Sequence, residues 1–369
     1  MSSERALALT TGLALFSMFF GSGNLVFPLL VGSGSGGSLL LSTLGLILTA
    51  VCVPLLGCLG ILLYDGKPEQ FFQLLGRKGF LLFSFISLAL MGPFGVLARC
   101  LTVAHGTFVN FYPDLSLQLF SIVSCLLLFV AAVYRSRLLQ ILGVWLTPLL
   151  LVSLGGIFLL SFFQGGVENS KILLNWDAFV LGSTQGYQTM DLLAALFFSG
   201  FVVAQLRSTE RNAASLFRVF LRASVIAGLL LGIVYAGLVY LGFQYSAILE
   251  SVAPQSMLAT IASHAMGPYG GIIVCATFAL ACYTTALVLT VLFADFLRKE
   301  LCQDKIPQWL SVGVTLVIAY LISTLEFSGI AQFLGPILET VYPLLIALTI
   351  WNIAKKRFDG DLALKYYES

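Results

Sequence analysis

The stretch Phe19-Phe20-Gly21-Ser22-Gly23-Asn24-Leu25-Val26-Phe27-Pro28 lies inside the first long apolar run of this 369-residue chain. In helix propensity, each glycine costs about 1 kcal/mol and an interior proline about 3 kcal/mol. Lipid offers no hydrogen-bond partner to unwound backbone, so such a break survives where it lines a cavity and meets a ligand or an ion. The stretch therefore predicts a membrane helix that unwinds at Gly21 to Asn24 beside a binding site. The alternative is a small-residue contact for a neighbouring helix.

The composition places most of the chain in a membrane. It is 59% hydrophobic and 10% charged, with a mean hydropathy of +0.99, whereas soluble domains carry about 25% charged residues. Apolar runs recur along the chain, each long enough to cross about 30 Å of hydrocarbon as a helix. We expect an all-α integral membrane protein with about ten transmembrane helices. The expected spans are Leu7 to Val31, Leu39 to Tyr64, Phe80 to Ala104, Leu117 to Tyr134, Leu138 to Phe163, Asp177 to Leu206, Val219 to Phe243, Gly271 to Leu297, Leu310 to Thr324, and Pro336 to Ala354.

Basic residues fall in every second gap between these spans. Because basic residues in short loops stay in the cytoplasm, both termini are predicted to be cytoplasmic, with a short tail at residues 355–369. Small basic groups along one membrane face indicate no nucleic-acid partner. The residues are Arg5, Lys67, Arg77, Lys78, Arg135, Arg137, Arg207, Arg211, Arg298, Lys299, Lys305, Lys355, Lys356, Arg357 and Lys365.

The chain divides at the polar stretch Gln164 to Trp176 into halves of about five spans each, residues 7–163 and 177–354 of one transmembrane domain. An odd number of spans per half gives the halves opposite topologies, which predicts an inverted repeat with a broken lead span in each half. The matching break is Gly182-Ser183-Thr184-Gln185-Gly186-Tyr187-Gln188-Thr189-Met190-Asp191, which is too polar for lipid and too glycine-rich for regular helix. The alternative is an external loop, with a shorter span beginning near Met190.

The breaks and a threonine pair suggest a binding chemistry. Half-helix N-termini suit a carboxylate, and unwound carbonyls suit a small cation. Thr284 and Thr285 lie near the predicted midplane, where their hydroxyls could complete a sodium-sized site, although membrane threonines also bond to carbonyls of their own helix. Gly92-Pro93-Phe94-Gly95 predicts a kink that brings backbone or an aromatic ring to a substrate, or one that serves packing alone.

Three ionisable residues need a separate interpretation. Arg99 is expected near the external surface, where its long side chain reaches water, in preference to a gating or substrate role. Asp191 is either a functional charge at membrane depth or the N-terminal cap of the second half-helix. Glu339 is expected to be a solvated carboxylate at the external rim. Gly32 to Gly37 fits the letters G-x-G-x-x-G, but it follows a membrane helix and not a strand, so it does not indicate a nucleotide site. No phosphate-loop, zinc or hydrolase motif occurs in the chain, and we predict no enzyme activity. A channel or a membrane-embedded enzyme remains a rival interpretation.

Two stretches resemble the bacterial branched-chain amino acid:cation symporters of the BrnQ type, namely Phe19 to Pro28 and Gly186-Tyr187-Gln188-Thr189-Met190-Asp191-Leu192-Leu193-Ala194-Ala195-Leu196. Leu280 to Thr285 and Gly92 to Phe94 are similar to the same family, over most of the chain. The resemblance implies the five-plus-five inverted repeat of the LeuT-like APC superfamily, with helices 1 and 6 broken. Such symporters often have about twelve spans and this chain about ten, which keeps the repeat core complete. Oligomeric state stays open.

The resemblance also implies an activity and a set of site residues. We expect alternating-access import of leucine, isoleucine, valine or a similar apolar amino acid through the bacterial inner membrane, with Na⁺ as the coupling ion and no cofactor. Another small amino acid, or proton coupling, is the alternative. The implied cation ligands are the carbonyls of Ser17, Phe20 and Ala281 and the hydroxyls of Thr284 and Thr285. The implied substrate site comprises Gly21; Ser22, Gly23 and Asn24 for the carboxylate; and Gly186, Tyr187, Gln188, Gly92, Pro93 and Phe94 for the amino group and the side chain.

Overall fold

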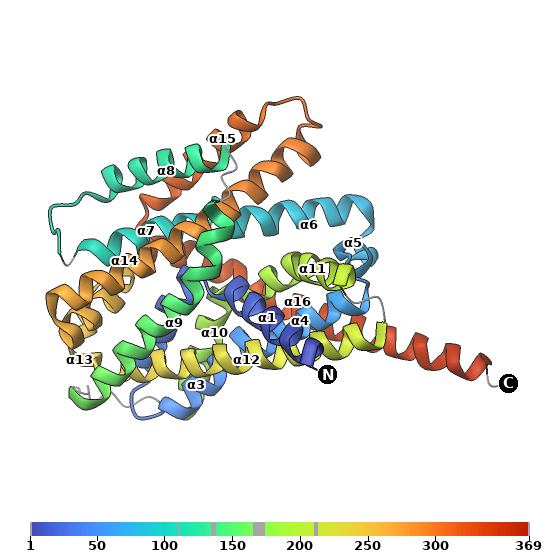
Figure 1. Ribbon diagram of the computed structural model, residues 1–369, viewed down its shortest axis with the longest axis horizontal. Coiled ribbons are helices and arrows are strands. Elements are labelled where there is room, and N and C mark those ends of the chain that lie inside the picture. The colour runs from blue at the N-terminus through green and yellow to red at the C-terminus, as the bar shows by residue number, and fades with distance from the viewer. Residues whose placement is uncertain (1, 110, 134–137, 165–173, 210–212, 368–369) are drawn as a thin grey trace.

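A computed structural model describes residues 2–109, 111–133, 138–164, 174–209 and 213–367 (Figure 1). This part of the chain is helical and contains no β-strand. The α-helices are α1 (Ser2–Phe19), α2 (Ser22–Gly34), α3 (Leu39–Ile47), α4 (Val53–Leu63), α5 (Pro68–Phe71), α6 (Gly76–Met91), α7 (Val96–Val109), α8 (Leu117–Val133), α9 (Leu138–Gln164), α10 (Asn175–Gln188), α11 (Asp191–Thr209), α12 (Ala213–Gln244), α13 (Ser246–Leu249), α14 (Met257–Phe296), α15 (Gln308–Ser323) and α16 (Glu326–Tyr367). Short π or 3₁₀ segments are η1 (Leu48–Cys52), η2 (Gln73–Leu75), η3 (Pro254–Ser256) and η4 (Leu297–Leu301).

Several helices are long and apolar enough to cross a membrane. In the described residues there are 6 such helices, or 7 if the bent pair α1 and α2 is one span, beside three shorter apolar helices. The chain is therefore a multi-pass membrane protein. The count of ten spans and the inverted repeat stay predictions. Residues 165–173 of the predicted divide, and the basic residues Arg135, Arg137 and Arg211, lie outside the described residues.

The first span is broken at the position that Gly21 and Gly23 led us to predict. α1 ends at Phe19 and α2 begins at Ser22, with the two helices bent by 73°. Gly21 has extended backbone at the N-cap of α2, and its N–H donates to Asn24 Oδ1 at 3.3 Å. The break is shorter than predicted, because Ser22 to Asn24 form the first turn of α2 instead of unwound chain. A helix can start directly after the break because the first-turn N–H groups need no helical partner.

The second break lies later than the sequence suggested. α10 continues through Gly182 to Gln188, and the interruption is Thr189 and Met190, whose φ is 62°. The expectation that Gly182 to Gln188 is not regular helix was wrong, as was the alternative of an external loop. The glycines serve packing instead: a Cβ on Gly182 would lie 1.9 Å from the Ser42 carbonyl oxygen of α3. Tertiary packing outweighs poor helix propensity here.

The helix is interrupted at Gly92 to Gly95, where the sequence predicted a kink. α6 ends at Met91 and α7 begins at Val96, with turns between them. A Cβ placed on Gly92 would lie 3.3 Å from Phe293 of α14, and one on Gly95 would lie 3.1 Å from Leu334 of α16. The kink therefore sits where α7 passes between α14 and α16.

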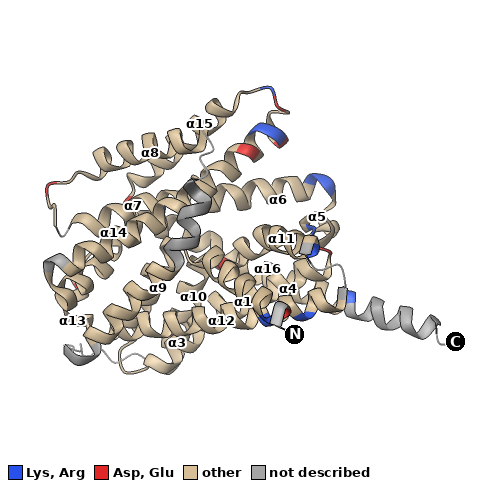
Figure 2. Cartoon of the chain, in the orientation of Figure 1, with Lys and Arg blue, Asp and Glu red and all other residues tan. Residues whose placement is uncertain are grey.

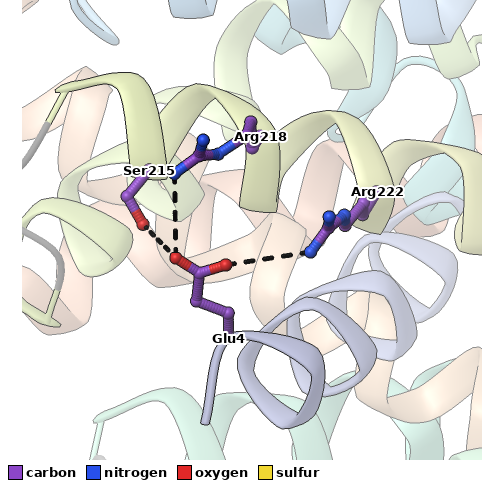
Figure 3. Close-up of polar contacts among 4 residues, drawn as sticks. All are labelled: Glu4, Ser215, Arg218 and Arg222. Carbon is purple, nitrogen blue, oxygen red and sulfur yellow. Dashed lines mark hydrogen bonds and ion pairs between the residues drawn. The ribbon is translucent and has the colours of Figure 1, made fainter. Parts of the chain in front are cut away.

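Helix α12 packs along both halves of the broken first span. A Cβ on Gly32 of α2 would lie 2.0 Å from the Val239 carbonyl oxygen of α12, and one on Gly12 of α1 would lie 2.9 Å from Ile226. At the start of α1, the Glu4 carboxylate accepts a hydrogen bond of 3.0 Å from Ser215 and lies 3.9 and 3.8 Å from the arginines Arg218 and Arg222 of α12 (Figure 3). The angle between α1 and α2 is thus fixed against one continuous helix.

Charge is distributed unevenly along the molecule. In Figure 2 the coloured Lys and Arg residues gather at the end that holds the N-terminus, α5 and the tip between α14 and α15. Among the residues coloured in Figure 2, the end with α13 and the loop between α7 and α8 shows no comparable basic group. By the rule that basic loops stay in the cytoplasm, the end with these Lys and Arg residues is the one predicted to face the cytoplasm.

Candidate functional site

The two helix breaks meet through one side chain. Asn24 Nδ2 of α2 donates to Asp191 Oδ2, the first residue of α11, at 2.8 Å. The Tyr235 hydroxyl of α12 donates to the same oxygen at 3.2 Å and also accepts a hydrogen bond from Asn24. Thr189 lies beside them, with its Cα 3.6 Å from where a Cβ on Gly23 would stand. Residues predicted to break two separate spans are therefore neighbours in space.

Asp191 is buried at the start of the second half-helix, and its role as a functional charge or as a helix cap stays a prediction. It is buried, with 3% of its surface exposed, and it begins a helix. A buried carboxylate needs hydrogen-bond donors and favourable charge around it, and here the amide, the phenol and the positive end of the α11 dipole supply them. Asp191 is thus a carboxylate inside the helix bundle and the first residue of the second half-helix.

The first turn of α2 is a candidate anion site. The N–H groups of Ser22, Gly23 and Asn24 lie at the N-terminus of the helix, where no preceding turn supplies carbonyl partners. Ser22 is fully buried, and its hydroxyl accepts a hydrogen bond of 3.4 Å from the Cys100 thiol of α7. These backbone donors and the hydroxyl are buried away from bulk water, a setting that suits a carboxylate.

The predicted cation ligands lie partly together. Thr285 of α14 lies against the break, with its methyl carbon 3.6 Å from a Cβ placed on Gly21. Thr284 donates to the Ala281 carbonyl at 2.9 Å, so two expected ligands bond to each other within α14. A threonine bonded to a carbonyl of its own helix is the structural alternative that the sequence left open. The Thr284 hydroxyl oxygen still has lone pairs that could bind an ion.

The end of α1 supplies the remaining predicted cation ligands. The Gly21 N–H donates to Asn24 Oδ1 at 3.3 Å, at the point where α1 has ended. Phe20 is buried at 5% exposure and stacks on Phe16 at 5.2 Å between ring centroids. Ser17 is exposed in the chain taken alone. A cation role for Ser17 and Phe20 stays a prediction.

The other predicted substrate residues are dispersed around the breaks. Gly186 faces η1, where a Cβ would lie 1.9 Å from Thr49 Oγ1. The Tyr187 ring lies 5.1 Å from the Tyr342 ring of α16. The kink at Gly92 to Phe94 contacts α14 through Gly92, and α7 reaches the breaks further along, through Arg99 and Cys100. Sequence reasoning did not place Arg99 or Cys100 at this site.

Arg99 is the largest side chain that the structure buries fully, with 1% exposed. Its guanidinium donates to the Gln188 carbonyl at 2.7 Å and to Gln188 Oε1 at 2.6 Å. Its Cζ atom lies 5.0 Å from the Phe27 ring centroid and 5.6 Å from that of Phe327. The expectation that Arg99 extends to external water was therefore wrong. Its position within an apolar run was the available signal, because cations inside membrane spans usually face the bundle interior.

A pocket of about 350 Å³ opens beside Arg99. Its lining residues are Phe27, Leu30, Gln185, Gln188, Pro254, Phe327, Ser328, Ala331, Gln332, Gly335, Pro336 and Glu339. Glu339 is exposed at this pocket, and its position at the external rim stays a prediction. Arg99 lies directly behind Phe27, Gln188 and Phe327, so these residues separate the pocket from the paired helix breaks.

Comparisons with known proteins point in one direction. Residues 4–366 match the sequence profile of a family described as "Branched-chain amino acid transport protein". The chain is 29% identical to the branched-chain amino acid permease BrnQ of Bacillus subtilis over 370 residues, which covers 95% of this chain and 81% of the permease. It is also 29% identical to the branched-chain amino acid transport system 3 carrier protein of Pseudomonas aeruginosa, over 94% of this chain and 82% of that protein. A putative branched-chain amino acid carrier protein of Staphylococcus saprophyticus is 29% identical over 91% of this chain and 79% of its own length.

Proposed function

This chain belongs to the family of branched-chain amino acid transport proteins, and from that premise we propose that it imports leucine, isoleucine or valine together with Na⁺ by alternating access. One observation carries the proposal beyond the family: two broken helices meet at the bond between Asn24 and Asp191. Irregular backbone inside a membrane bundle lines substrate and ion sites in transporters. The transported amino acid would bind beside this bond.

The substrate carboxylate would bind at the start of α2. Ser22, Gly23 and Asn24 present backbone N–H groups there, and the helix dipole favours negative charge. The ammonium group and the apolar side chain would face α10 and α7, toward Tyr187 and the kink at Gly92 to Phe94. Those contacts follow from the family resemblance.

The coupling ion would lie on the other side of the first break. The carbonyls of Ser17, Phe20 and Ala281 and the hydroxyls of Thr284 and Thr285 are neutral oxygen donors, which suit a sodium ion without adding a buried negative charge. The contact between Thr285 and Gly21 supports this position. A membrane potential of 100 mV contributes about 2.3 kcal/mol per inward positive charge, which can drive accumulation of the amino acid.

Architecture and location form part of the same proposal. We place the chain in the bacterial inner membrane with its basic end and both termini in the cytoplasm, and we assign it the LeuT-like repeat of five plus five spans. The bent first span and the interrupted α10 and α11 pair, which begin the two predicted halves, support this assignment.

Uptake of labelled leucine into proteoliposomes tests the function. We expect accumulation that requires an inward Na⁺ gradient and that unlabelled isoleucine and valine inhibit. Thr285→Ala should raise the half-saturating Na⁺ concentration about tenfold, a loss of about 1.4 kcal/mol of binding. Thr324→Ala is the matched control, because Thr324 is exposed and its hydroxyl bonds only within its own helix.

Three results would contradict parts of the proposal. Uptake that a proton gradient drives and that does not depend on Na⁺ would show that the coupling ion is H⁺ and not Na⁺. Equilibration without accumulation would favour a facilitator or channel. Failure to transport or bind any apolar amino acid would remove the substrate class.

A further inference from the structure

Arg99 lies between the pocket and the paired helix breaks. On one side, three of its neighbours, Phe27, Gln188 and Phe327, line the pocket. On the other side, the next residue, Cys100, donates its thiol hydrogen to Ser22 at the first break. Gln188 is the last residue of α10 and directly precedes the second break. One arginine thus connects the wall of the pocket to both interrupted helices.

The partners of Arg99 do not neutralise its charge. Among the described residues, its hydrogen bonds go to the carbonyl and amide oxygens of Gln188, which are neutral, and its Nε atom has no hydrogen-bond partner. The Phe27 and Phe327 rings add cation–π attraction on either side. Burial of a cation costs free energy unless an anion pairs with it. The Arg99 guanidinium should therefore bind an anion more strongly than it binds Gln188.

We propose that Arg99 and Gln188 form a latch between the pocket and the helix breaks, and that the latch opens when the α-carboxylate of an entering amino acid replaces Gln188 on the guanidinium. This inference rests on the proposed amino-acid substrate. The planar guanidinium matches a carboxylate in a bidentate geometry, and such charged bonds are about twice as strong as neutral ones. The pocket is then an outer site for the zwitterion, with Glu339 at its rim.

Release of Gln188 would also alter the second break. Its carbonyl is at the C-terminus of α10, where a cation stabilises the negative end of the helix dipole. Its side-chain Nε2 donates to the Ala331 carbonyl of α16 at 3.3 Å, so Gln188 bridges α7 and α16. Loss of the Arg99 contact therefore frees the end of α10 at the moment the substrate carboxylate arrives.

The variant Gln188→Glu tests the exchange. It places a fixed carboxylate on Arg99, which the substrate carboxylate must then displace. We expect the apparent KM for leucine to rise at least about tenfold, equivalent to about 1.4 kcal/mol, with an unchanged or higher melting temperature. If Arg99 only capped α10, its bond to the backbone carbonyl of residue 188 would remain in Gln188→Glu and the KM would stay the same.

Gln185→Glu measures the general effect of a new carboxylate, because Gln185 lines the same pocket on the same helix. Arg99 donates to Gln188 and not to Gln185, so we expect a smaller rise in KM than in Gln188→Glu. A rise in KM as large as that of Gln188→Glu would show a general charge effect and would overturn the latch. An unchanged KM in Gln188→Glu would overturn it as well.

A second measurement does not depend on transport. Cys100 is 1% exposed and lies on the inner side of the latch, so its reaction with a membrane-impermeant maleimide applied outside intact cells reports whether the latch is open. In Arg99→Lys, the ammonium keeps the charge but loses the planar fork. We expect Cys100 in Arg99→Lys to react at least about tenfold faster than in the wild-type protein. A tenfold larger open population corresponds to a latch weakened by about 1.4 kcal/mol.

Cys100→Ala in the Arg99→Lys background must abolish the added labelling. This control shows that the added labelling comes from Cys100 and not from another cysteine. A wild-type labelling rate in Arg99→Lys, or labelling from the cytoplasmic face alone, would overturn the latch. The two failures are distinguishable: absence of leucine uptake by the wild-type protein removes the proposed function, whereas the labelling experiment needs no substrate.

Discussion

Asn24 uses both ends of its amide. The Oδ1 atom accepts the Gly21 N–H at the start of α2, and the Nδ2 atom donates to Asp191 at the start of α11. An amide is the smallest side chain that can accept at one atom and donate at the other, and aspartate at position 24 would oppose Asp191 with a second negative charge. The joint between the breaks therefore requires this residue type.

Asn24→Ala should destabilise the protein and abolish uptake. Removal of the amide leaves the buried Asp191 carboxylate with fewer donors, which costs about 1–3 kcal/mol. The measurement is the melting temperature of the purified protein in detergent, together with leucine uptake. Asn175→Ala removes the same side chain at an exposed position and should change neither. Wild-type melting and uptake in Asn24→Ala would show that the joint has no role.

Sequence reasoning reached some of these residues and missed their pairing. Asn24 and Asp191 were each selected because they stand at a break, but they are 167 positions apart, and a single sequence carries no signal for their contact. Arg99 was misplaced because the external end of its span was set too close to it. The hydroxyl of Thr284 could not be assigned, since a bond to its own helix and a bond to an ion use the same oxygen.

At the scale of the element, glycines decide how closely α10 approaches its neighbours. A Cβ on Gly186 would lie 1.9 Å from Thr49 Oγ1 of η1, and one on Gly45 of α3 would lie 2.3 Å from the Phe179 carbonyl of α10. Without a hydrophobic driving force between helices in lipid, such close backbone packing is a main source of association.

Gly186→Ala should therefore destabilise the protein by about 1–3 kcal/mol through overpacking. The double variant with Thr49→Ala removes the atom nearest the new methyl group and should recover part of the loss. Thermal unfolding and the yield of monodisperse protein measure both effects. Gly232→Ala of α12 is the control: nothing lies within 4 Å of its added Cβ, so equal or greater stability is expected. Equal losses in the two single variants would contradict the packing argument.

The order of helices was largely predictable, and their interruptions only in part. Two glycines with a following proline correctly indicated the first break, and Gly92 with Pro93 indicated the kink. The second break was set too early because Gly182 and Gly186 have low helix propensity, whereas their lack of a side chain favours a helix packed against another backbone. Propensity and packing make opposite predictions at such glycines, and the sequence does not say which prevails.

Across the whole molecule, the basic end defines an orientation that can be measured. Cys302 lies between η4 and α15, at the end where Lys and Arg gather. An impermeant maleimide should label it in inside-out vesicles and not in intact cells, with Cys302→Ala as the blank. Asp114→Cys in the Cys302→Ala background, in the loop between α7 and α8 at the other end of Figure 1, should show the opposite pattern. Identical sidedness of the two positions would refute the predicted topology.

The membrane class followed from composition alone, since no soluble fold tolerates so many long apolar runs. The repeat of five plus five was inferred from span parity, and parity depends on segments outside the described residues. Physical reasoning therefore gave the class and the broken first helix, while the relation between the halves depends on contacts distant in sequence.

The position of α12 across the corner of the first span constrains how this transporter can move. A helix that touches α1 before the bend and α2 after it acts as a brace, since any change in the 73° angle would pull one arm away from its glycine contacts. The three helices should thus travel as a single rigid body. The conformational cycle would then consist of this body rocking against α11, with the bond between Asn24 and Asp191 as the point about which the two bodies turn.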